Sequence, residues 1–235
     1  MIGENVQALR ARIAEAATRA GRAPQSVRLL AVSKTQPAAA VEEAARAGLA
    51  AFGENYVQEA LAKLDALAAL KLEWHLIGPL QGNKARLVAE RFDWVQTVDR
   101  ERIARRLSDA RPEARGPLDV LVQINVSGEA SKSGVAPADA PSLARAVAAM
   151  PRLRLRGLMA IPEPTEDAAL QRARFREVRA IYERLNAEGL ALDTLSLGMS
   201  GDLEAAILEG STMIRVGTAI FGQRAPARPA ASPER

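Results

Sequence analysis

The chain has 235 residues, 48% of them hydrophobic, and a formal net charge of +4. This length and hydrophobic content suit one large domain with a core of its own rather than a disordered chain. The absence of cysteine excludes disulfide bonds, thiolate metal sites and a thiol nucleophile, and it suits a reducing compartment.

Several classes of partner are also disfavoured. The chain begins without the basic and apolar regions of a secretory signal, and no apolar run is long enough to span a bilayer. Five of the 32 basic residues are lysines, and the arginines are spread among acidic residues. Aromatic residues, which stack on nucleic-acid bases, make up only 3%. We therefore expect a cytoplasmic protein that binds neither nucleic acid nor a membrane.

The chain opens with an amphipathic helix over residues 4–20, in which Val6, Leu9, Ile13 and Ala17 recur at helical spacing. Strands and helices then alternate. Strands are predicted near residues 28–34, 50–54, 74–78, 94–98, 118–126, 153–161, 194–199 and 212–221. Helices are predicted near residues 37–48, 55–71, 81–91, 99–111, 138–150, 166–188 and 201–209. This alternation indicates βα units with parallel strand pairing.

No low-complexity linker divides the chain, so residues 1–224 are expected to form a single domain. Residues 225–235 contain prolines at positions 226, 229 and 233 and are expected to form a disordered tail.

Two architectures accept the alternating pattern, an open doubly wound sheet and a closed (β/α)8 barrel, the TIM barrel. Polar residues stand at or near the carboxyl ends of the predicted strands: Lys34, Glu54, Asn55, Asn125, Ser127, Ser200 and the run from Arg215 to Thr218. In a barrel the first and eighth strands are neighbours, and all eight carboxyl ends surround one mouth. In an open sheet the first and eighth strands need not be close, so the barrel, which gives the polar residues one common site, is preferred.

Lys34 lies at the end of the first predicted strand. A lysine charge is costly to bury inside an apolar strand, but at the carboxyl end the side chain can point into a site. A desolvated lysine loses its proton more easily, and the neutral amine can form a Schiff base with an aldehyde. The alternative is a lysine that snorkels to water.

Two stretches near the last two predicted strands suit a phosphate group. Ser200 and Gly201 stand where a strand gives way to a helix, and a helix amino terminus offers free N–H groups and a positive dipole end. Gly217 allows close approach of a ligand to the backbone, and Thr218 adds a hydroxyl donor. In eight-stranded barrels, phosphate commonly binds after strands seven and eight. The alternative for Ser200 is an ordinary N-cap.

Arg215 shares a strand face with Gly217, two residues away, and is a candidate to face the ring of the ligand. The alternative is a salt bridge at the barrel mouth. A phosphorylated aldehyde would satisfy Lys34, the phosphate-binding stretches and Arg215 together. Pyridoxal phosphate (PLP) is the common metabolite that fits this description.

These residues also carry a resemblance to a known family. Six motifs occur in order: Val32–Thr35, Phe52–Glu59, His75–Lys84, Gly157–Ile161, Leu197–Asp202 and Arg215–Gly222. Together they resemble the pyridoxal phosphate homeostasis proteins, the YggS/PROSC-like family, from about residue 5 to residue 224.

The resemblance implies a single fold-type III barrel that is similar to the barrel domain of alanine racemase, with an extra N-terminal helix. It implies that Lys34 holds PLP as a Schiff base and that Arg215 faces the pyridine nitrogen. Ser200, Gly201, Gly217 and Thr218 match phosphate-binding positions, and Asn55 and Met159 match positions near the cofactor. Gln36 stands where relatives often carry lysine. No metal is implied.

The roles of two further polar residues stay open. His75, the only histidine, is a candidate general base, but its place three residues before Gly78 favours a structural role. Glu54 either orients Asn55 or acts as a carboxylate at a helix start.

Two classes of function remain, a carrier that stores and delivers PLP and a PLP-dependent enzyme such as an amino-acid racemase. A protonated arginine keeps the pyridine nitrogen unprotonated, which weakens the cofactor as an electron sink. A racemase also needs acid–base groups on both faces of the substrate carbon. In alanine racemase one of these is a tyrosine from a separate β domain, which we do not expect in this chain. The carrier without robust catalysis is therefore preferred.

The comparison with alanine racemase, whose separate β domain makes dimers, favours a monomer. The expected acceptors of delivered PLP are the apo-forms of PLP enzymes. Lys132, in the loop after the fifth predicted strand, is a candidate second amine that takes the aldehyde from Lys34 and passes it outward. The alternative for Lys132 is a solvated side chain.

Overall fold

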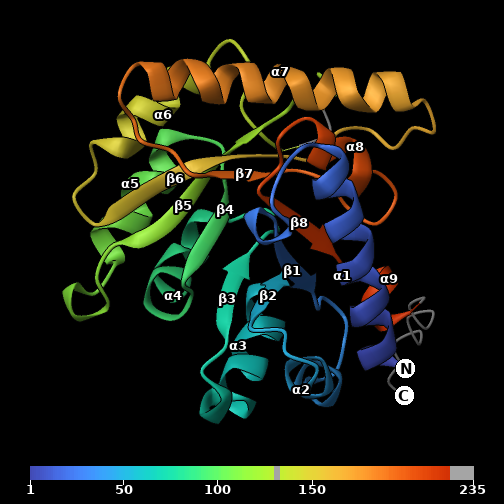
Figure 1. Cartoon of the computed structure of the whole chain (residues 1–235). Helices are drawn as coiled ribbons and strands as arrows, with labels where there is room; N and C mark the ends of the chain where they lie inside the picture. Colours follow the sequence, from blue (N-terminus) through green and yellow to red (C-terminus); the bar gives the residue numbers. More distant parts are fainter. Residues whose placement is uncertain (130–132, 223–235) are drawn as a thin grey trace, which may run out of the picture.

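The computed structural model describes residues 1–129 and 133–222, and within them eight parallel strands form one closed barrel in sequence order (Figure 1). The ring closes because β1 pairs with both β2 and β8. The strands are β1 (Arg28–Val32), β2 (Ala51–Glu54), β3 (Glu73–Leu76), β4 (Trp94–Val98), β5 (Leu118–Ile124), β6 (Leu153–Ala160), β7 (Thr194–Ser196) and β8 (Met213–Val216). The predicted TIM barrel is confirmed, and the open sheet is excluded.

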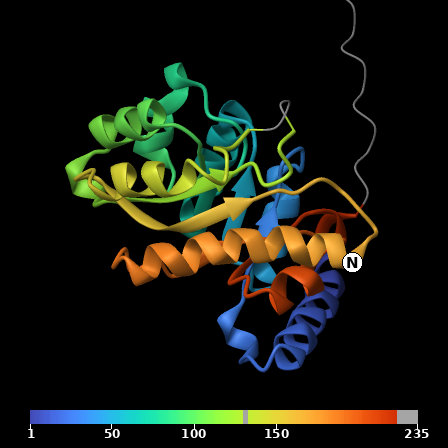
Figure 2. The ribbon, with the colours of Figure 1, turned by 90° about the horizontal axis from the view of Figure 1, so that it is seen from above.

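Helices surround the barrel, as the view from above shows (Figure 2). They are α1 (Ile2–Arg19), α2 (Ala38–Arg46), α3 (Val57–Ala66), α4 (Ala85–Arg91), α5 (Glu101–Ala110), α6 (Ala140–Ala148), α7 (Ala168–Ala187), α8 (Leu203–Leu208) and α9 (Thr218–Phe221). Short 3-10 helices cover Pro24–Ser26, Ala68–Leu70, Gly82–Lys84 and Glu113–Arg115. None of the helices in the described residues is long and apolar enough to cross a membrane.

The first helix, α1, precedes the barrel and is the expected extra element. It lies against α8, α9 and α2 (Figure 1). Val6, Leu9 and Ile13 form its buried face, spaced three and four residues apart. Burying each such side chain stabilises the fold by about 1.5–3 kcal/mol. The helix therefore ties the first and last parts of the described chain together.

Strand alternation decides which side chains enter the barrel. Leu30 and Val32 of β1 pack with Ala51, Ile77 and Met213 in a cluster inside the ring, whereas the intervening β1 residue packs toward the helices. Lys34 follows the end of β1 by two residues, in the turn that leads to α2. The strand therefore brings the Lys34 turn to the carboxyl end of the barrel.

The eighth predicted strand was too long, and its second half is a helix. The strand predicted for 212–221 ends at Val216, and α9 begins at Thr218. Ile220 is fully buried, and the Asn5 side-chain amide donates to its backbone oxygen at 2.9 Å. Packing against α1 thus outweighs the strand preference of this short run.

Other bounds differ by a few residues. β1 ends two residues before Lys34, β7 ends four residues before Ser200, and the helix expected over 55–71 breaks after Ala66. The expected tail at 225–235 and Lys132 lie outside the described residues, so these expectations stay predictions.

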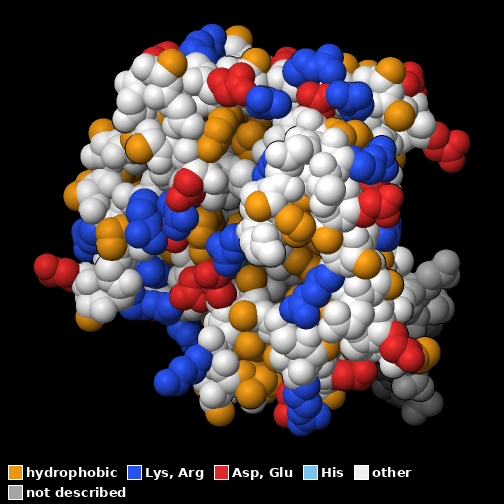
Figure 3. Space-filling view, viewed as in Figure 1, with side chains coloured by type: hydrophobic (Ala, Val, Ile, Leu, Met, Phe, Trp, Pro, Cys, Tyr) orange, Lys and Arg blue, Asp and Glu red, His pale blue; other side chains and the backbone are white. Residues whose placement is uncertain are grey.

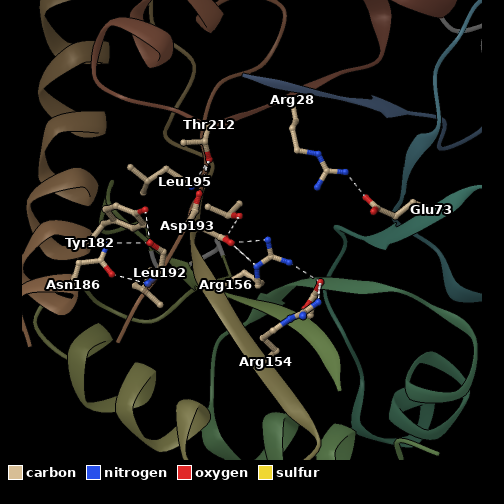
Figure 4. Close-up of polar contacts among 12 residues, drawn as sticks. Arg28, Glu73, Arg154, Arg156, Tyr182, Asn186, Leu192, Asp193, Leu195 and Thr212 are labelled. Atoms are coloured by element: carbon tan, nitrogen blue, oxygen red, sulfur yellow. Dashed lines mark hydrogen bonds and ion pairs between the residues drawn. The ribbon is translucent and has the colours of Figure 1, made fainter. Parts of the chain in front are cut away.

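The amino-terminal end of the barrel carries a charged cluster (Figure 4). Arg156 donates to Asp193 at 2.6 Å and to Asp119 at 2.9 Å, and its guanidinium carbon lies 4.8 Å from the ring centre of Trp94. Trp94 is buried with interior side chains of β5 and β6. These residues, together with the Arg28–Glu73 pair at 2.7 Å, form what we call the barrel floor.

Surface charges of both signs are interspersed on the face seen in Figure 3. Several arginines pair with acids one helical turn away, as in Arg46–Glu42 at 2.6 Å. Such exposed pairs each contribute little to stability, but they make the surface hydrophilic without a single-sign field.

Candidate functional site

Lys34 lies in a tight turn between β1 and α2 and is half-buried. Thr35 has a φ of 64°, in the left-handed region that a non-glycine residue rarely adopts. The turn is held by a bond from the Gln36 N–H to the Ser33 oxygen at 3.0 Å. The Thr35 N–H donates to Glu59 Oε1 at 2.6 Å. The backbone around Lys34 is therefore fixed on both sides of the lysine.

A buried ion-pair cluster supports this turn from behind. Lys63 Nζ donates to Glu54 Oε1 and to the Ser33 backbone oxygen, each at 2.7 Å, and to Glu59 Oε1 at 2.6 Å. The Ser33 hydroxyl donates to Glu54 Oε1 at 2.6 Å. Burial raises the pKa of Glu54, although the hydrogen bonds from Lys63 and Ser33 oppose this. Glu54 thus holds the turn that carries Lys34, a role that neither sequence interpretation gave it.

The register of β1 and β8 brings Gly217 beside the base of the Lys34 turn. Ala31 pairs with Val216, so Gly217 lies beside Val32. A Cβ atom at Gly217 would lie only 2.9 Å from the Val32 backbone oxygen. Because the site admits no side chain at this position, glycine is required by the close approach of the two backbones.

Arg215 of β8 is almost completely buried inside the barrel. Its Nη1 donates to the Ser196 hydroxyl at 2.7 Å and also bonds the Ser196 backbone oxygen, while Nη2 donates to the Ala160 oxygen at 2.8 Å. Burial lowers the pKa of Arg215 to about 10, and the charge of Asp202 opposes the shift. The guanidinium therefore stays protonated near neutral pH, and no carboxylate bonds it directly among the described residues. The alternative of a salt bridge at the mouth is wrong.

Three bonds from Arg215 use three of its five N–H donors. No described residue accepts a bond from the other two. A buried cation with donors to spare can serve an acceptor in a ligand, such as an unprotonated ring nitrogen. This observation fits the proposed place of the PLP ring.

Donors without acceptors also occur at the positions expected to bind phosphate. No residue within 1–129 and 133–222 accepts a hydrogen bond from the hydroxyls of Ser200 and Thr218, or from the backbone N–H groups of Gly201, Gly217 and Thr218. The N-cap of α8 is Asp202, so the N-cap interpretation of Ser200 is wrong. Asp202 instead accepts from the Met199 N–H at 2.6 Å. The ends of β7 and β8 therefore offer several uncommitted donors, as an anion requires.

Asn55 and Met159 differ in their surroundings. Asn55 follows β2 directly and is half-buried, with its backbone packed so closely under Gly78 that a Cβ there would lie 2.3 Å from the Asn55 oxygen. Met159 is fully buried in the barrel with Trp94. It directly precedes Ala160, whose oxygen binds Arg215, so it lies in the layer beneath the mouth.

His75 is fully buried inside the barrel and is bonded on the side of the barrel floor. Its ring stacks on Trp94, with the ring centres 5.0 Å apart, and its Nε2 lies 2.6 Å from Glu73 Oε1. Burial lowers the pKa of His75, against the effect of Glu73. This environment agrees with the structural interpretation of His75.

Sequence reasoning missed Lys63, Gln96 and Ser196. A signal for Lys63 exists, because it occupies the apolar stripe of its helix, between the buried Ala60 and Leu64. Gln96 is likewise a polar residue in the middle of a buried strand. Nothing in the spacing indicates that Ser196 and Gln96, one hundred positions apart, are in contact.

Comparison with known proteins identifies the family. Residues 5–225 match the family described as the N-terminal domain of alanine racemase. The pyridoxal phosphate homeostasis protein of Pseudomonas aeruginosa is 61% identical over 229 residues, which are 97% of this chain and 98% of that protein. The protein of the same name in Escherichia coli (strain K12) is 55% identical over 226 residues, 95% of this chain and 97% of that protein.

A solved structure of PipY from Synechococcus elongatus, described as having PLP bound, has the same fold. It is 38% identical, has a TM-score of 0.82, and the match covers 94% of this chain and 100% of that chain. These matches run through all six motifs on which the resemblance rests. The chain belongs to the pyridoxal phosphate homeostasis protein family and has the barrel of the alanine racemase N-terminal domain.

Proposed function

We propose that this chain binds PLP at the carboxyl mouth of the barrel and serves PLP homeostasis by storing and delivering the cofactor. The observation that carries the proposal is the set of uncommitted donors at the ends of β7 and β8, beside the strand that leads to Lys34. The named relatives and the PLP-bound PipY structure support the choice of ligand.

Each part of the cofactor has a partner in this arrangement. Lys34 supplies the amine for a Schiff base with the aldehyde, which is the reactive group that PLP brings. Ser200, Gly201, Gly217 and Thr218 bind the phosphate. Arg215 donates to the ring nitrogen from inside the barrel. Asn55 borders the pyridine ring of PLP from the side of the mouth, and Met159 borders it from the barrel interior.

We infer a carrier rather than an enzyme. Reversible proton transfer at a substrate carbon needs a second acid–base group opposite Lys34. The hydroxyl of Tyr182 donates to the Leu192 oxygen at 2.7 Å on the outer helix layer, and Tyr56 is 59% exposed. His75 lies below the mouth, bound to Glu73. Of the two tyrosines and the single histidine, none is therefore fixed by a described partner opposite Lys34.

The alternative function is a weak PLP-dependent racemase. The barrel shared with the alanine racemase N-terminal domain favours it. It would show as loss of optical activity of an L-amino acid in the presence of the PLP-loaded protein, and that loss would disappear in Lys34→Ala.

Three further properties belong to the proposal. We infer a monomer that acts in the cytoplasm and hands PLP to apo-enzymes. Sedimentation of the purified protein tests the monomer. Transfer of PLP to an apo-enzyme, followed through the activity of that enzyme, tests delivery.

The experiment that tests the site is chemical trapping. PLP is added to the purified protein, the complex is reduced with borohydride, and the pyridoxyl adduct is located by peptide mapping. We expect the adduct on Lys34, one of only five lysines. Lys34→Ala should lose the adduct and keep the unfolding transition, because Lys34 is only half-buried. An adduct mainly on another lysine would contradict the assignment.

A further inference from the structure

A continuous chain of hydrogen bonds, buried except at Glu73, runs through the barrel from Arg215 to the floor. Arg215 Nη1 contacts the Ser196 hydroxyl at 2.7 Å, and that hydroxyl contacts Gln96 Oε1 at 2.7 Å. Gln96 Nε2 lies 2.9 Å from His75 Nδ1, and His75 Nε2 lies 2.6 Å from Glu73 Oε1. Four different strands, β8, β7, β4 and β3, supply these side chains.

The arginine at one end fixes the direction of every bond in the chain. A guanidinium can only donate, so the Ser196 oxygen accepts from Arg215 and its own proton goes to Gln96 Oε1. The Gln96 amide nitrogen then points to His75 and donates to Nδ1. This leaves the His75 proton on Nε2, from which it is donated to Glu73.

The floor end of the chain is anchored as well. Glu73 Oε1 also accepts from Arg28 Nη2 at 2.7 Å, and Figure 4 shows this pair at the floor. The His75 ring lies nearly parallel to the Trp94 ring, at 10°, which fixes its plane. Burial keeps the pKa of His75 below its usual value, so the neutral form required by the directional argument is the stable one. The chain therefore has a charged residue at each end, Arg215 and Glu73, and neutral side chains with fixed orientations between them.

We propose that Ser196, Gln96 and His75 are positioning residues that act through Arg215 on recognition of the PLP ring nitrogen. The inference rests on the proposed function, because it needs PLP bound above Arg215. A long arginine side chain has several rotamers, and the two oxygens of Ser196 hold the guanidinium of Arg215 in one of them. Gln96 and His75 keep the Ser196 hydroxyl turned so that its oxygen accepts from Arg215. Pre-organised donors of this kind bind an acceptor without the cost of ordering it on binding.

The test compares PLP with its 1-deaza analogue, in which a carbon replaces the ring nitrogen. The ratio of the two dissociation constants reports the contact with Arg215 and is insensitive to the phosphate and Lys34 contacts, which both ligands share. A hydrogen bond from a charged donor predicts that the unmodified protein binds PLP about tenfold or more tightly than the analogue.

Gln96→Met and Ser196→Ala each interrupt the chain without touching the ligand. We expect each variant to lose affinity for PLP, to keep its affinity for the analogue, and so to bring the ratio to within about threefold of one. His75→Phe keeps a ring on Trp94 but removes both nitrogens, and it should lower the ratio less, because Gln96 still contacts Ser196.

Thr97→Val is the matched control. Thr97 neighbours Gln96 on β4, is buried, and donates to the Gly78 oxygen at 2.9 Å, away from Arg215. This variant loses one buried hydrogen bond, so it should lower the denaturation midpoint and leave the ratio unchanged. The same fall of the ratio in Thr97→Val would mean that the effect comes from general destabilisation, and the proposal would be wrong.

Three other outcomes also decide the matter. An unchanged ratio in folded Gln96→Met and Ser196→Ala overturns the positioning role. A ratio near one in the unmodified protein overturns it too, while the proposed function survives if the borohydride adduct still forms on Lys34. Absence of any adduct on Lys34 in the unmodified protein overturns both. If Gln96→Met does not fold, the affinity ratios of Ser196→Ala and His75→Phe decide whether the positioning role holds. Ser196→Ala removes only a hydroxyl group and is the smaller change.

Discussion

The side-chain ammonium of Lys63 lies 2.7 Å from the backbone oxygen of Ser33, the residue directly before Lys34. This bond joins helix α3 to the turn that carries Lys34, the proposed Schiff-base lysine. The same ammonium pairs with the buried carboxylate of Glu54, whose side chain has no exposure to solvent. The position of the Lys34 turn therefore depends on a second lysine, which is buried behind it.

Replacing Lys63 by methionine should damage both the fold and the site. Removing one partner of a buried ion pair typically costs about 3–5 kcal/mol, because the other charge is left in a place of low polarity. The expected result is a lower free energy of unfolding and slower formation of the Lys34 adduct with PLP. Urea denaturation measures the first, and timed borohydride trapping measures the second.

The double variant Lys63→Met, Glu54→Gln should recover part of the stability, because no unpaired carboxylate remains. Lys71→Met is the control, since Lys71 is an exposed lysine at the end of the same α3–β3 connection. If Lys63→Met traps PLP at the unmodified rate, the turn does not need this support.

Removing the hydroxyl donors should weaken binding of PLP but not of pyridoxal. Ser200→Ala and Thr218→Val each delete one donor to a charged group, worth about 1.5–3 kcal/mol. This corresponds to a loss of roughly one to two powers of ten in PLP affinity. Fluorescence titration with both ligands measures the effect. Equal affinity of the unmodified protein for PLP and pyridoxal would argue against a phosphate site.

Gly201 and Gly217, the two glycines proposed to bind phosphate, should respond differently to replacement by alanine. A Cβ at Gly217 would lie 2.9 Å from the Val32 oxygen, so Gly217→Ala must push β1 and β8 apart, at a cost of about 1–3 kcal/mol. A Cβ at Gly201 would meet nothing within 4 Å, so Gly201→Ala is the matched control. We expect only Gly217→Ala to lower the thermal midpoint of the ligand-free protein. Similar midpoints for both variants would show that the backbones can separate freely.

Glu73 should contribute to the acid dependence of stability. Burial alone would raise the pKa of Glu73, but the hydrogen bonds from His75 and Arg28 and the charge of Arg28 lower it from 4.5 to about 2. A carboxyl with a lowered pKa stabilises the fold above its unfolded value, and that contribution is lost as the pH falls through the folded value.

The stability of the unmodified protein should therefore decline between pH 4.5 and about 2, with a shallower decline in Glu73→Gln. Urea denaturation at a series of pH values measures both slopes. Glu166→Gln, on an exposed residue, serves as control. Identical slopes for Glu73→Gln and the unmodified protein would contradict the role assigned to the Glu73–His75 bond.

Much of the architecture could be predicted from the sequence because its signals are local. Alternating strand and helix patterns give parallel βα units, and the polar residues after the strands become neighbours only when the sheet closes. The same logic placed Lys34, Arg215 and Gly217 near one mouth. The register of β1 and β8 then brings Gly217 beside Val32, as a barrel requires.

The features that were missed depend on contacts between distant positions. The run Thr218–Phe221 has strand-forming residues, and it becomes helical because Ile220 packs under α1. The bond between Ser196 and Gln96 spans the barrel, and it depends on strand tilt, which spacing along the chain does not reveal. Lys63 was the exception, since a lysine in an apolar stripe was a visible signal.

The barrel floor limits the routes by which a ligand can enter and leave the barrel. The paired side chains of Arg28, Glu73, Arg156 and Asp119, with Trp94 above them, fill the end of the ring opposite Lys34. A molecule held at the mouth must leave by the route through which it arrived. Under the proposed function, loading and unloading therefore use one opening, and an acceptor enzyme meets the same face that free PLP uses. Excess free PLP should accordingly slow the handover by occupying that face.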